Sequence, residues 1–359
     1  MLDLLYKLAY NSCVGCDWCA EACPWSPRYK PRERLQGMVE AVEACTMCGR
    51  CVLKCPLKVP THKRVYEYRT KKGIVHEELT KIRERSEEIG QSFGIGGSEW
   101  AEFAKSKGFK VDERARWLFL PSAFDVLPNA RLDLLAELWV LDKLGYDFTL
   151  SSKHPEGYGN FIFDMADPDY FKKKALEVIK TAEELDVEGI IIGECGADYK
   201  VWPRLHMFIG IKAPFKVLTF PEAVYRRRKE IVVERMIEKR VGYHDPCGLA
   251  RYNFVTQEPR EIIKMITPFY EERGPSERIQ MCCGGGAGVS FVNELKRKAV
   301  ETIGPKKIEQ FKGLDLVLTS CSKCKSMLLT YTLLLRGGFN VHRLSYALAW
   351  SMGLDVPAP

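Results

Sequence analysis

The chain has 359 residues, which is about two domains' worth of sequence. Hydrophobic residues make up 46% and charged residues 28%, as in a globular protein that buries cores. The net charge of +7 is spread over many residues, so it does not by itself indicate nucleic-acid binding. No stretch approaches about 18 uninterrupted apolar residues, which argues against a membrane span. The first residues lack an apolar segment ending in small residues, so we expect no export signal and a cytoplasmic protein.

Cysteine is the unusual component of the sequence, with 14 residues. Eight cysteines precede residue 56, and none lies between residues 56 and 194. Disulfides are found mainly in exported proteins. Because no export is expected, the cysteines favour metal binding or redox chemistry.

Two cysteine runs within residues 1–70 have the same spacing. Each reads C-x2-C-x2-C-x3-C-P, and together they contain Cys13, Cys16, Cys19, Cys23, Cys45, Cys48, Cys51 and Cys55. This is the spacing of bacterial two-cluster ferredoxins, in which the fourth cysteine of each run binds the other cluster. It predicts one [4Fe–4S] cubane on Cys13, Cys16, Cys19 and Cys55, and a second on Cys45, Cys48, Cys51 and Cys23. Zinc and disulfides are the alternatives, but zinc sites usually use two separated cysteine pairs.

Four basic residues lie between the two runs: Arg28, Lys30, Arg32 and Arg34. They fit a surface that docks an acidic electron-transfer partner, or charges that tune a cluster potential. A plain solvated basic loop is the interpretation we favour.

Residues 71–113 are expected to form a helical linker. The segment HEELTKIRERSEEI is charged and periodic, which predicts a solvated helix, and GIGGSEW after it predicts a connector. From about residue 114, short apolar runs alternate with helical patterns, as in α/β units. Residues 189–192 and 314–318 are predicted to be buried strands, and each is followed closely by a cysteine and then a helical stretch.

An internal repeat divides this part of the chain. Pro121 matches Pro246, the segment ending at Cys195 matches the segment ending at Cys321, and FKVLTFPEAV matches FNVHRLSYAL. All three matches have spacings of 124 to 126 residues. They predict two similar α/β lobes, 114–240 and 241–359, after a helical N-terminal domain. Chance apolar similarity is the alternative.

The second lobe carries five more cysteines on three separate segments. They are Cys247, Cys282, Cys283, Cys321 and Cys324, in the pattern C-x34-CC-x37-C-x2-C. Five thiolates suit a cluster better than one tetrahedral zinc ion, which needs four ligands. Structural free thiols are an alternative, and a phosphate loop at GGGAG is another. The phosphate loop fails because Val289 occupies the last glycine position of its fingerprint.

The local sequence around these cysteines favours a bound anionic centre. The glycines that follow Cys283 permit a sharp bend and let backbone N–H groups approach sulfur. Cys321 and Cys324 fall where a predicted strand ends and a helix begins, and a helix N-terminus stabilises thiolates. Ligand sites at the carboxyl ends of strands are the general rule in α/β folds.

The C-terminal pattern beside a two-cluster ferredoxin segment resembles the catalytic-subunit family of heterodisulfide reductase. Its relatives include a sulfite-reductase-associated membrane-complex subunit and the iron–sulfur subunits of glycerol-3-phosphate and glycolate oxidation. The resemblance covers nearly the whole chain and implies two lobes of the cysteine-rich CCG type. It also implies that Cys247, Cys282, Cys283, Cys321 and Cys324 hold a non-cubane [4Fe–4S] cluster where a substrate disulfide is cleaved.

The first lobe departs from this family pattern, because the best-known reductases carry two full copies of the motif. Ser122 stands opposite Cys247, Pro155-Glu156 opposite the vicinal cysteines, and Asp198 opposite Cys324. Only Cys195 remains, so lobe 114–240 is expected to be degenerate and to bind no cluster of its own. This arrangement most resembles the sulfite-reductase-associated branch, which acts on a small sulfur-carrier protein. Cys195 is either an extra ligand or redox-active thiol, or a packed remnant.

His244 lies three residues before Cys247 and is a candidate proton donor to a leaving thiolate. A structural histidine hydrogen-bonded at a strand end is the alternative, and the one we favour. Arg251 is a candidate for binding a substrate carboxylate, or for pairing with Asp245.

These features predict an iron–sulfur oxidoreductase with three clusters, two cubane and one non-cubane. Electrons are expected to pass through the cubanes to the C-terminal centre, which reduces or forms a disulfide. The main alternative is a relay between a flavin dehydrogenase and a membrane quinone or cytochrome, and a redox sensor is a third. Because no flavin or dinucleotide fingerprint is present, electrons must come from a partner protein. The family resemblance implies a hetero-oligomeric complex, with peripheral attachment to a membrane protein of the cytochrome b type or to a flavoprotein.

Overall fold

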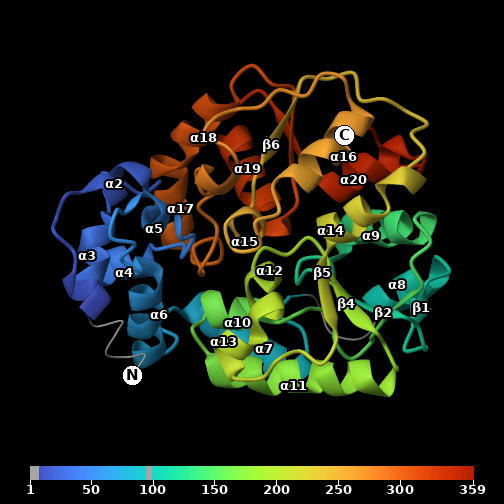
Figure 1. The fold of residues 1–359 in the computed structure, drawn as a ribbon, viewed down its shortest axis with the longest axis horizontal. Helices are drawn as coiled ribbons and strands as arrows, with labels where there is room; N and C mark the ends of the chain where they lie inside the picture. The colour runs from blue at the N-terminus through green and yellow to red at the C-terminus, as the bar shows by residue number, and fades with distance from the viewer. Residues whose placement is uncertain (1–7, 94–98) are drawn as a thin grey trace.

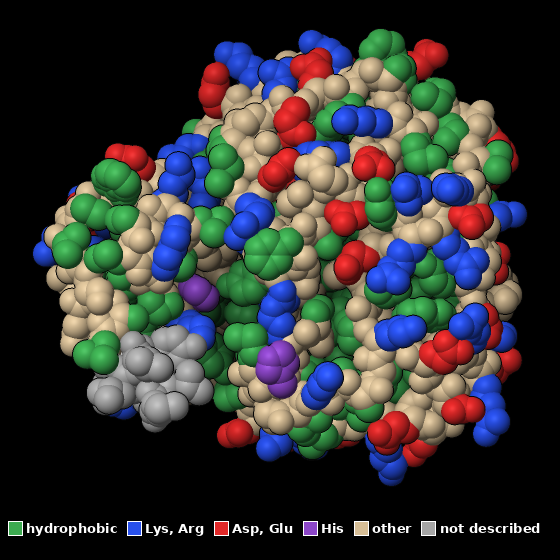
Figure 2. Space-filling view, viewed as in Figure 1, with side chains coloured by type: hydrophobic (Ala, Val, Ile, Leu, Met, Phe, Trp, Pro, Cys, Tyr) green, Lys and Arg blue, Asp and Glu red, His purple; other side chains and the backbone are tan. Residues whose placement is uncertain are grey.

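The computed structural model describes residues 8–93 and 99–359, which form three parts that pack together. Figure 1 shows a helical N-terminal segment in blue, a first lobe in green and yellow, and a second lobe in orange and red. The N-terminal segment lies against the second lobe, beside α17 and α18. Figure 2 shows a hollow where this segment meets the lobes, walled largely by hydrophobic side chains with basic ones near its rim.

The N-terminal segment consists of short helices separated by cysteine loops. They are α2 (Trp18–Ala22), α3 (Pro31–Leu35), α4 (Val39–Glu43), α5 (Arg50–Lys54) and α6 (Thr61–Lys72). Asp17 and Gly49 precede α2 and α5 with φ of 59° and 74°, and so turn each cysteine loop into its helix. Helices of about one turn are not stable alone, so α2 to α5 depend on tertiary packing.

The linker contains α7 (Glu77–Ile89) and α8 (Glu99–Ser106). The helix predicted from the charged segment is α7, which buries only Leu79 and Ser86 and leaves its other side chains partly or fully exposed. Most of the predicted connector, residues 94–98, lies outside the described residues, as does the start of the chain on which no export signal was expected.

The first lobe is built on a parallel sheet with the strand order β1-β3-β2-β4-β5. Its strands are β1 (Lys110–Val111), β2 (Trp117–Leu120), β3 (Phe148–Leu150), β4 (Gly189–Ile192) and β5 (Lys216–Thr219). Its helices are α9 (Arg131–Lys143), α10 (Gly159–Phe163), α11 (Pro168–Glu184), α12 (Asp198–Val201), α13 (Leu205–Ile209) and α14 (Phe220–Arg226). The predicted strand 189–192 is β4, which is buried throughout, as expected of a parallel strand covered on both faces.

The second lobe has a smaller parallel sheet with the order β6-β7-β8. Its strands are β6 (Val241–His244), β7 (Leu316–Thr319) and β8 (Asn340–Arg343). Its helices are α15 (Cys247–Ala250), α16 (Gln257–Ile266), α17 (Asn293–Thr302), α18 (Gly304–Phe311), α19 (Ser322–Leu334) and α20 (Leu344–Ser351). The strand predicted at 314–318 is β7, which starts two residues later and reaches Thr319. Short 3-10 helices join the longer elements: η1 (Pro128–Ala130), η2 (Trp202–Arg204), η3 (Arg228–Glu230) and η4 (Glu277–Ile279).

The two sheets share a common core order, since β2-β4-β5 corresponds to β6-β7-β8 along the chain. This is the arrangement that the internal repeat predicts. The mixed α/β class and the helical N-terminal segment are confirmed, whereas the assignment of the first lobe to the CCG type stays a prediction.

The hydrophobic core is shared among the three parts rather than divided between them. One buried cluster joins Trp25 of the N-terminal segment to Phe161 of the first lobe and Met327 of the second. A second buried cluster lies between the lobes and includes side chains of α9 and α20. No helix within residues 8–93 and 99–359 is long and apolar enough to span a bilayer.

Candidate iron–sulfur centres

The cysteines of the N-terminal segment converge in two groups. One cavity is lined by Cys13, Cys16, Cys19 and Cys55, and another by Cys23, Cys45, Cys48 and Cys51. These are the two interleaved sets that the ferredoxin spacing predicts. Cys13 and Cys16 are exposed, whereas Cys45 and Cys48 are buried. We therefore call the first group the outer centre and the second the inner centre.

The inner centre contains a buried arginine, Arg34, which the sequence analysis assigned to a solvated basic loop. Arg34 is 2% exposed, donates from Nη1 to Cys23 Sγ at 3.1 Å, and donates from Nε to the Ala41 carbonyl. Burial lowers its pKa, but the thiolates of Cys23 and Cys45 outweigh burial and raise the pKa above its ordinary value. The favoured interpretation of a solvated basic loop is wrong for Arg34, which acts on a cluster ligand.

The five cysteines of the second lobe are brought together at the carboxyl ends of β6 and β7. Cys247 begins α15 just after β6, Cys321 precedes α19 just after β7, and Cys324 lies in the first turn of α19. The vicinal pair comes from the loop between η4 and α17. All five thiols line one cavity, which we call the C-terminal centre, and which also contains Cys195.

The five cysteine sulfurs of the C-terminal centre lie close to one another. Cys324 Sγ lies 3.2 Å from Cys283 Sγ, and Cys321 is within hydrogen-bonding reach of Cys324. Cys282 is within reach of both Cys247 and Cys283. A chain of thiols this close, and directed into one cavity, fits a shared polynuclear centre better than five independent structural thiols.

At two glycines beside the cysteines, the neighbouring atoms leave no space for a side chain. A Cβ added at Gly284, where φ is 90°, would lie 2.7 Å from the Tyr331 hydroxyl and 2.8 Å from Ile303 Cδ1. A Cβ at Gly196 would lie 2.9 Å from Cys321 Sγ. The Gly284 N–H donates to Cys282 Sγ at 3.4 Å, as anticipated for a glycine loop that approaches sulfur.

The surroundings of these thiols stabilise thiolates at several positions. A hydrogen bond from Cys282 lowers the pKa of Cys247 to about 6, and Lys200 and Arg251 act in the same direction against burial. Hydrogen bonds from Cys282 and Cys324 likewise lower the pKa of Cys283. Thiolates are the form in which cysteine binds iron.

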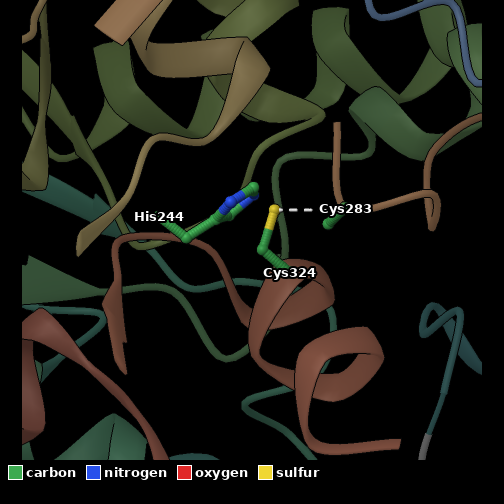
Figure 3. A group of neighbouring side chains, drawn as sticks. All are labelled: His244, Cys283 and Cys324. Carbon is green, nitrogen blue, oxygen red and sulfur yellow. Dashed lines mark hydrogen bonds between the residues drawn. The ribbon is translucent and has the colours of Figure 1, made fainter. Parts of the chain in front are cut away.

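His244 faces the C-terminal centre from the end of β6, as Figure 3 shows beside Cys283 and Cys324. One ring nitrogen of His244 and the two sulfurs lie within 4.8 Å of one another. Its Nδ1 lies 3.2 Å from Lys307 Nζ. Burial, followed by the Lys307 charge, lowers the pKa of His244 to about 4, so the imidazole is neutral near pH 7.

The neighbours of His244 exclude one alternative left open by the sequence, the pairing of Arg251 with Asp245. Asp245 forms a two-pronged ion pair with Arg260 at 2.8 Å, so it does not pair with Arg251. Arg251 donates instead to three backbone carbonyls, those of Cys48, Arg278 and Gln280. It therefore ties the inner-centre loop to the second lobe.

The inner and C-terminal centres are direct neighbours. Thr46 Oγ1, next to Cys45, lies 3.4 Å from Cys282 Sγ, and Cys48 is within hydrogen-bonding reach of Cys282. A Cβ at Gly286 would lie 2.9 Å from the Thr46 carbonyl oxygen. The second cysteine run thus packs directly against the loop that carries the vicinal cysteines.

Cys195 lies at the end of β4, on the first-lobe side of the C-terminal centre. Its thiol hydrogen-bonds with the buried carboxyl of Asp198, and burial followed by Asp198 raises its pKa. Ser122 Oγ, which stands where the intact motif has its first cysteine, lies 2.6 Å from Ser322 Oγ. The first lobe thus closes the cavity with polar side chains where the intact motif has cysteines.

Three lysines around the C-terminal centre had no signal in the sequence: Lys307 and Lys200, which are buried, and Lys323, which is partly buried. Lys307 binds His244, the Met281 carbonyl and Gln310, and Lys323 forms an ion pair with Asp164. Lys200 reaches the cavity from α12. Each belongs to a run of sequence that reads as an ordinary helix, so only the tertiary fold reveals these positions.

Comparison with known protein families identifies both cysteine-rich regions. Residues 6–73 match a 4Fe-4S dicluster domain, and residues 241–329 match the cysteine-rich domain called CCG. One component protein of the dihydromethanophenazine:CoB–CoM heterodisulfide reductase of Methanosarcina acetivorans is 25% identical, over 92% of this chain and 83% of that protein.

Two further relatives match most of the chain at similar identity. The second iron–sulfur component of the Hdr-like menaquinol oxidoreductase of Archaeoglobus fulgidus is 24% identical, over 99% of this chain and 79% of that protein. One component protein of the CoM/CoB fumarate reductase of Methanothermobacter marburgensis is 25% identical, over 88% of this chain and 66% of that protein.

The chain is therefore an iron–sulfur protein that joins a 4Fe-4S dicluster domain to a CCG domain. It is an oxidoreductase related to a component of heterodisulfide reductase and to Hdr-like iron–sulfur proteins. The resemblance drawn from the cysteine spacing is confirmed, while the placement in the sulfite-reductase-associated branch stays a prediction.

Proposed function

We propose that the chain reduces, or in reverse forms, a disulfide or related sulfur substrate at the C-terminal centre. The two N-terminal cysteine groups would hold cubane [4Fe–4S] clusters, and the five C-terminal cysteines a non-cubane one. When bound, these clusters supply one-electron transfer. Reduction of the substrate follows R–S–S–R′ + 2 e⁻ + 2 H⁺ → RSH + R′SH, with the electrons supplied by a redox partner protein.

The observation that carries this proposal is the contact between the inner and C-terminal centres. Because Cys48 and Cys282 are within hydrogen-bonding reach, groups bound at the two sites would be neighbours with no intervening protein layer. Arg251 holds this contact through the Cys48 carbonyl. The outer centre, with its exposed cysteines, is the position at which a partner would exchange electrons.

Side chains at the C-terminal centre suit sulfur chemistry. Cys247 is the only one of the five cysteines that is not fully buried, so it marks the side open to substrate. His244 is neutral near pH 7 and lies beside Cys283, where Lys307 holds its ring. We assign His244 the transfer of a ring N–H proton to a leaving thiolate, while its Nδ1 takes up a proton from Lys307 Nζ so that the imidazole stays neutral. We assign Cys195 a place in the cavity wall that contacts substrate sulfur.

Membership of a hetero-oligomeric complex follows from the same comparison, because the relatives named above are parts of multi-component enzymes. We propose a membrane cytochrome or a flavoprotein as redox partner, with attachment to the membrane through that partner. A disulfide-bearing small molecule or a small sulfur-carrier protein is the proposed substrate.

Iron content and EPR of anaerobically purified protein test the proposal. We expect about 12 iron atoms per chain in the wild type and about eight in Cys283→Ala, with the signals of the two cubanes unchanged. Thiol added to the oxidised wild type should alter an EPR signal that Cys283→Ala lacks. About eight iron atoms in both proteins would contradict the C-terminal cluster. Three clusters without any thiol effect would support a pure electron relay instead.

A further inference from the structure

Among the described residues around the C-terminal centre, Lys200 differs from Lys307 and Lys323 because its ammonium has no hydrogen-bond or ion-pair partner. It is 3% exposed and lies in α12, where it lines the same cavity as the five cysteines. The Lys200 ammonium makes no hydrogen bond or ion pair with any residue in the described part of the chain. Its contacts are the aromatic faces of Phe163 at 4.6 Å and Tyr252 at 5.2 Å.

The other two lysines at this site, Lys323 and Lys307, both have polar partners. Lys323 faces the same cavity and is neutralised by Asp164. Lys307 lies behind His244 and has three hydrogen-bond partners. An ammonium has three N–H donors, and those of Lys200 have no protein acceptor in the described part of the chain. They are therefore available to an anion that enters the cavity.

The position of Lys200 connects it to the reacting sulfur. Phe163 belongs to the first lobe and Tyr252 to the second, so the two rings hold the ammonium at the junction of the lobes. A lysine ammonium is ordinarily charged near pH 7, and Lys200 lines the same cavity as Cys247, the cysteine on the open side of the centre.

We propose that Lys200 binds an anionic group, a carboxylate in the simplest case, of the thiol or disulfide that reacts at the C-terminal centre. This deepens the function proposed above and rests on it. The substrate class is then a thiol with a negative charge a few bonds from its sulfur. Lys200 is a specificity residue in this scheme and takes no part in electron or proton transfer.

Two disulfides that differ in charge test this assignment. Reduced methyl viologen supplies electrons, and the disulfides are 3,3′-dithiodipropionate, which carries two carboxylates, and the neutral bis(2-hydroxyethyl) disulfide. We expect Lys200→Met to raise KM for the dianion about tenfold or more and to change KM for the neutral disulfide by less than about twofold. Lys200→Arg, which keeps the charge, should restore much of the preference.

A binding measurement supports the assay without turnover. In the wild type, 3-mercaptopropionate should alter the EPR signal of the oxidised protein at lower concentration than 2-mercaptoethanol does. Lys200→Met should abolish that difference. The matched control is Lys173→Met on the exposed face of α11, which should behave as wild type. Iron content and thermal unfolding establish that each variant is folded and loaded.

Two results would overturn the assignment. Equal losses for the anionic and neutral disulfides in Lys200→Met would show that Lys200 acts on the centre as a whole, and an unchanged preference would show that the anion binds elsewhere. If the wild type neither reduces nor responds to any of these compounds, the proposed sulfur chemistry itself is overturned. That outcome differs from a failure of Lys200 alone.

Discussion

Arg34 places one positive charge next to a cysteine of the inner centre. It is buried, and its hydrogen bonds to Cys23 Sγ and the Ala41 carbonyl fix it against one cluster ligand. A positive charge close to a redox centre favours the reduced, more negative state. Arg34 would therefore raise the reduction potential of a cluster held at the inner centre, which favours electron flow inward.

Replacing this charge should move the potential in a defined direction. Arg34→Gln is expected to lower the midpoint potential of the inner cubane by on the order of 50–100 mV, or roughly 1–2 kcal/mol for one electron. Redox titration followed by EPR measures the shift. The control is Arg28→Gln, which removes a surface pair with Glu301. Equal potentials in Arg34→Gln and the wild type would mean that solvent screens the charge.

Some site residues could be predicted from the sequence and others could not. The spacing within C-x2-C-x2-C is short-range, so it determines which three cysteines of each run can share a centre before any tertiary structure forms. Lys200 and Lys307 carry no such local signal, because what matters is which side chains surround them after folding. Arg34 was assigned to a solvated loop for the same reason, since nothing nearby in sequence shows that it is buried.

Among the elements, the two loops that meet at Thr46 and Gly286 control the distance between centres. The vicinal-cysteine loop approaches the second cysteine run with no side chain between them at Gly286. Arg251 adds a bond from the second lobe to the Cys48 carbonyl. The separation of the centres is therefore set by backbone packing.

A single methyl group should weaken this contact. In Gly286→Ala the new Cβ would lie 2.9 Å from the Thr46 carbonyl oxygen, so one loop must move. We expect all clusters to be retained and the viologen-driven disulfide reduction to fall about tenfold, because electron transfer slows with distance. Ser290→Ala on the same loop is the control, since the buried Ser290 hydroxyl has no hydrogen-bond partner in the described structure. Full activity in Gly286→Ala would show that this contact does not limit turnover.

Strand prediction succeeded where an element is long and apolar and failed where it is short. The run GIII is buried on both faces and was identified as a strand by its composition alone. Strand β1 has two residues, Lys110 and Val111, and pairs with β3 at the sheet edge. No local pattern of two residues indicates a strand, so this edge was included in the linker.

At the scale of the whole molecule, one buried arginine joins the two lobes. Arg343, in β8, lies 2.9 Å from Asp125, 3.1 Å from Glu137 and 3.4 Å from Glu194, all in the first lobe. One cation cannot neutralise three carboxylates, and the repulsion among them favours a bound proton. Burial, opposed by Arg343, raises the pKa of Glu194 to about 7.

This raised pKa makes the stability of the whole protein depend on pH. Between the ordinary pKa of 4.5 and about 7, folded Glu194 keeps a proton that unfolded Glu194 has lost. The free energy of unfolding therefore falls as pH rises through this range, by up to roughly 2 kcal/mol between pH 5.5 and 7. Glu194→Gln should flatten that slope in anaerobic urea unfolding. A slope equal to that of the wild type would assign the pH dependence to other groups.

Cys13 and Cys16 are exposed, whereas Cys45 and Cys48 are buried, so the outer centre is more accessible to solvent than the inner centre. Oxygen and chelators reach the outer centre first, so damage to the protein should proceed inward from the surface. The inner centre is shielded by the same packing that joins it to the second lobe. A damaged molecule would thus lose its connection to the donor before it loses its reactive centre, and would become isolated from electrons while still able to bind sulfur compounds.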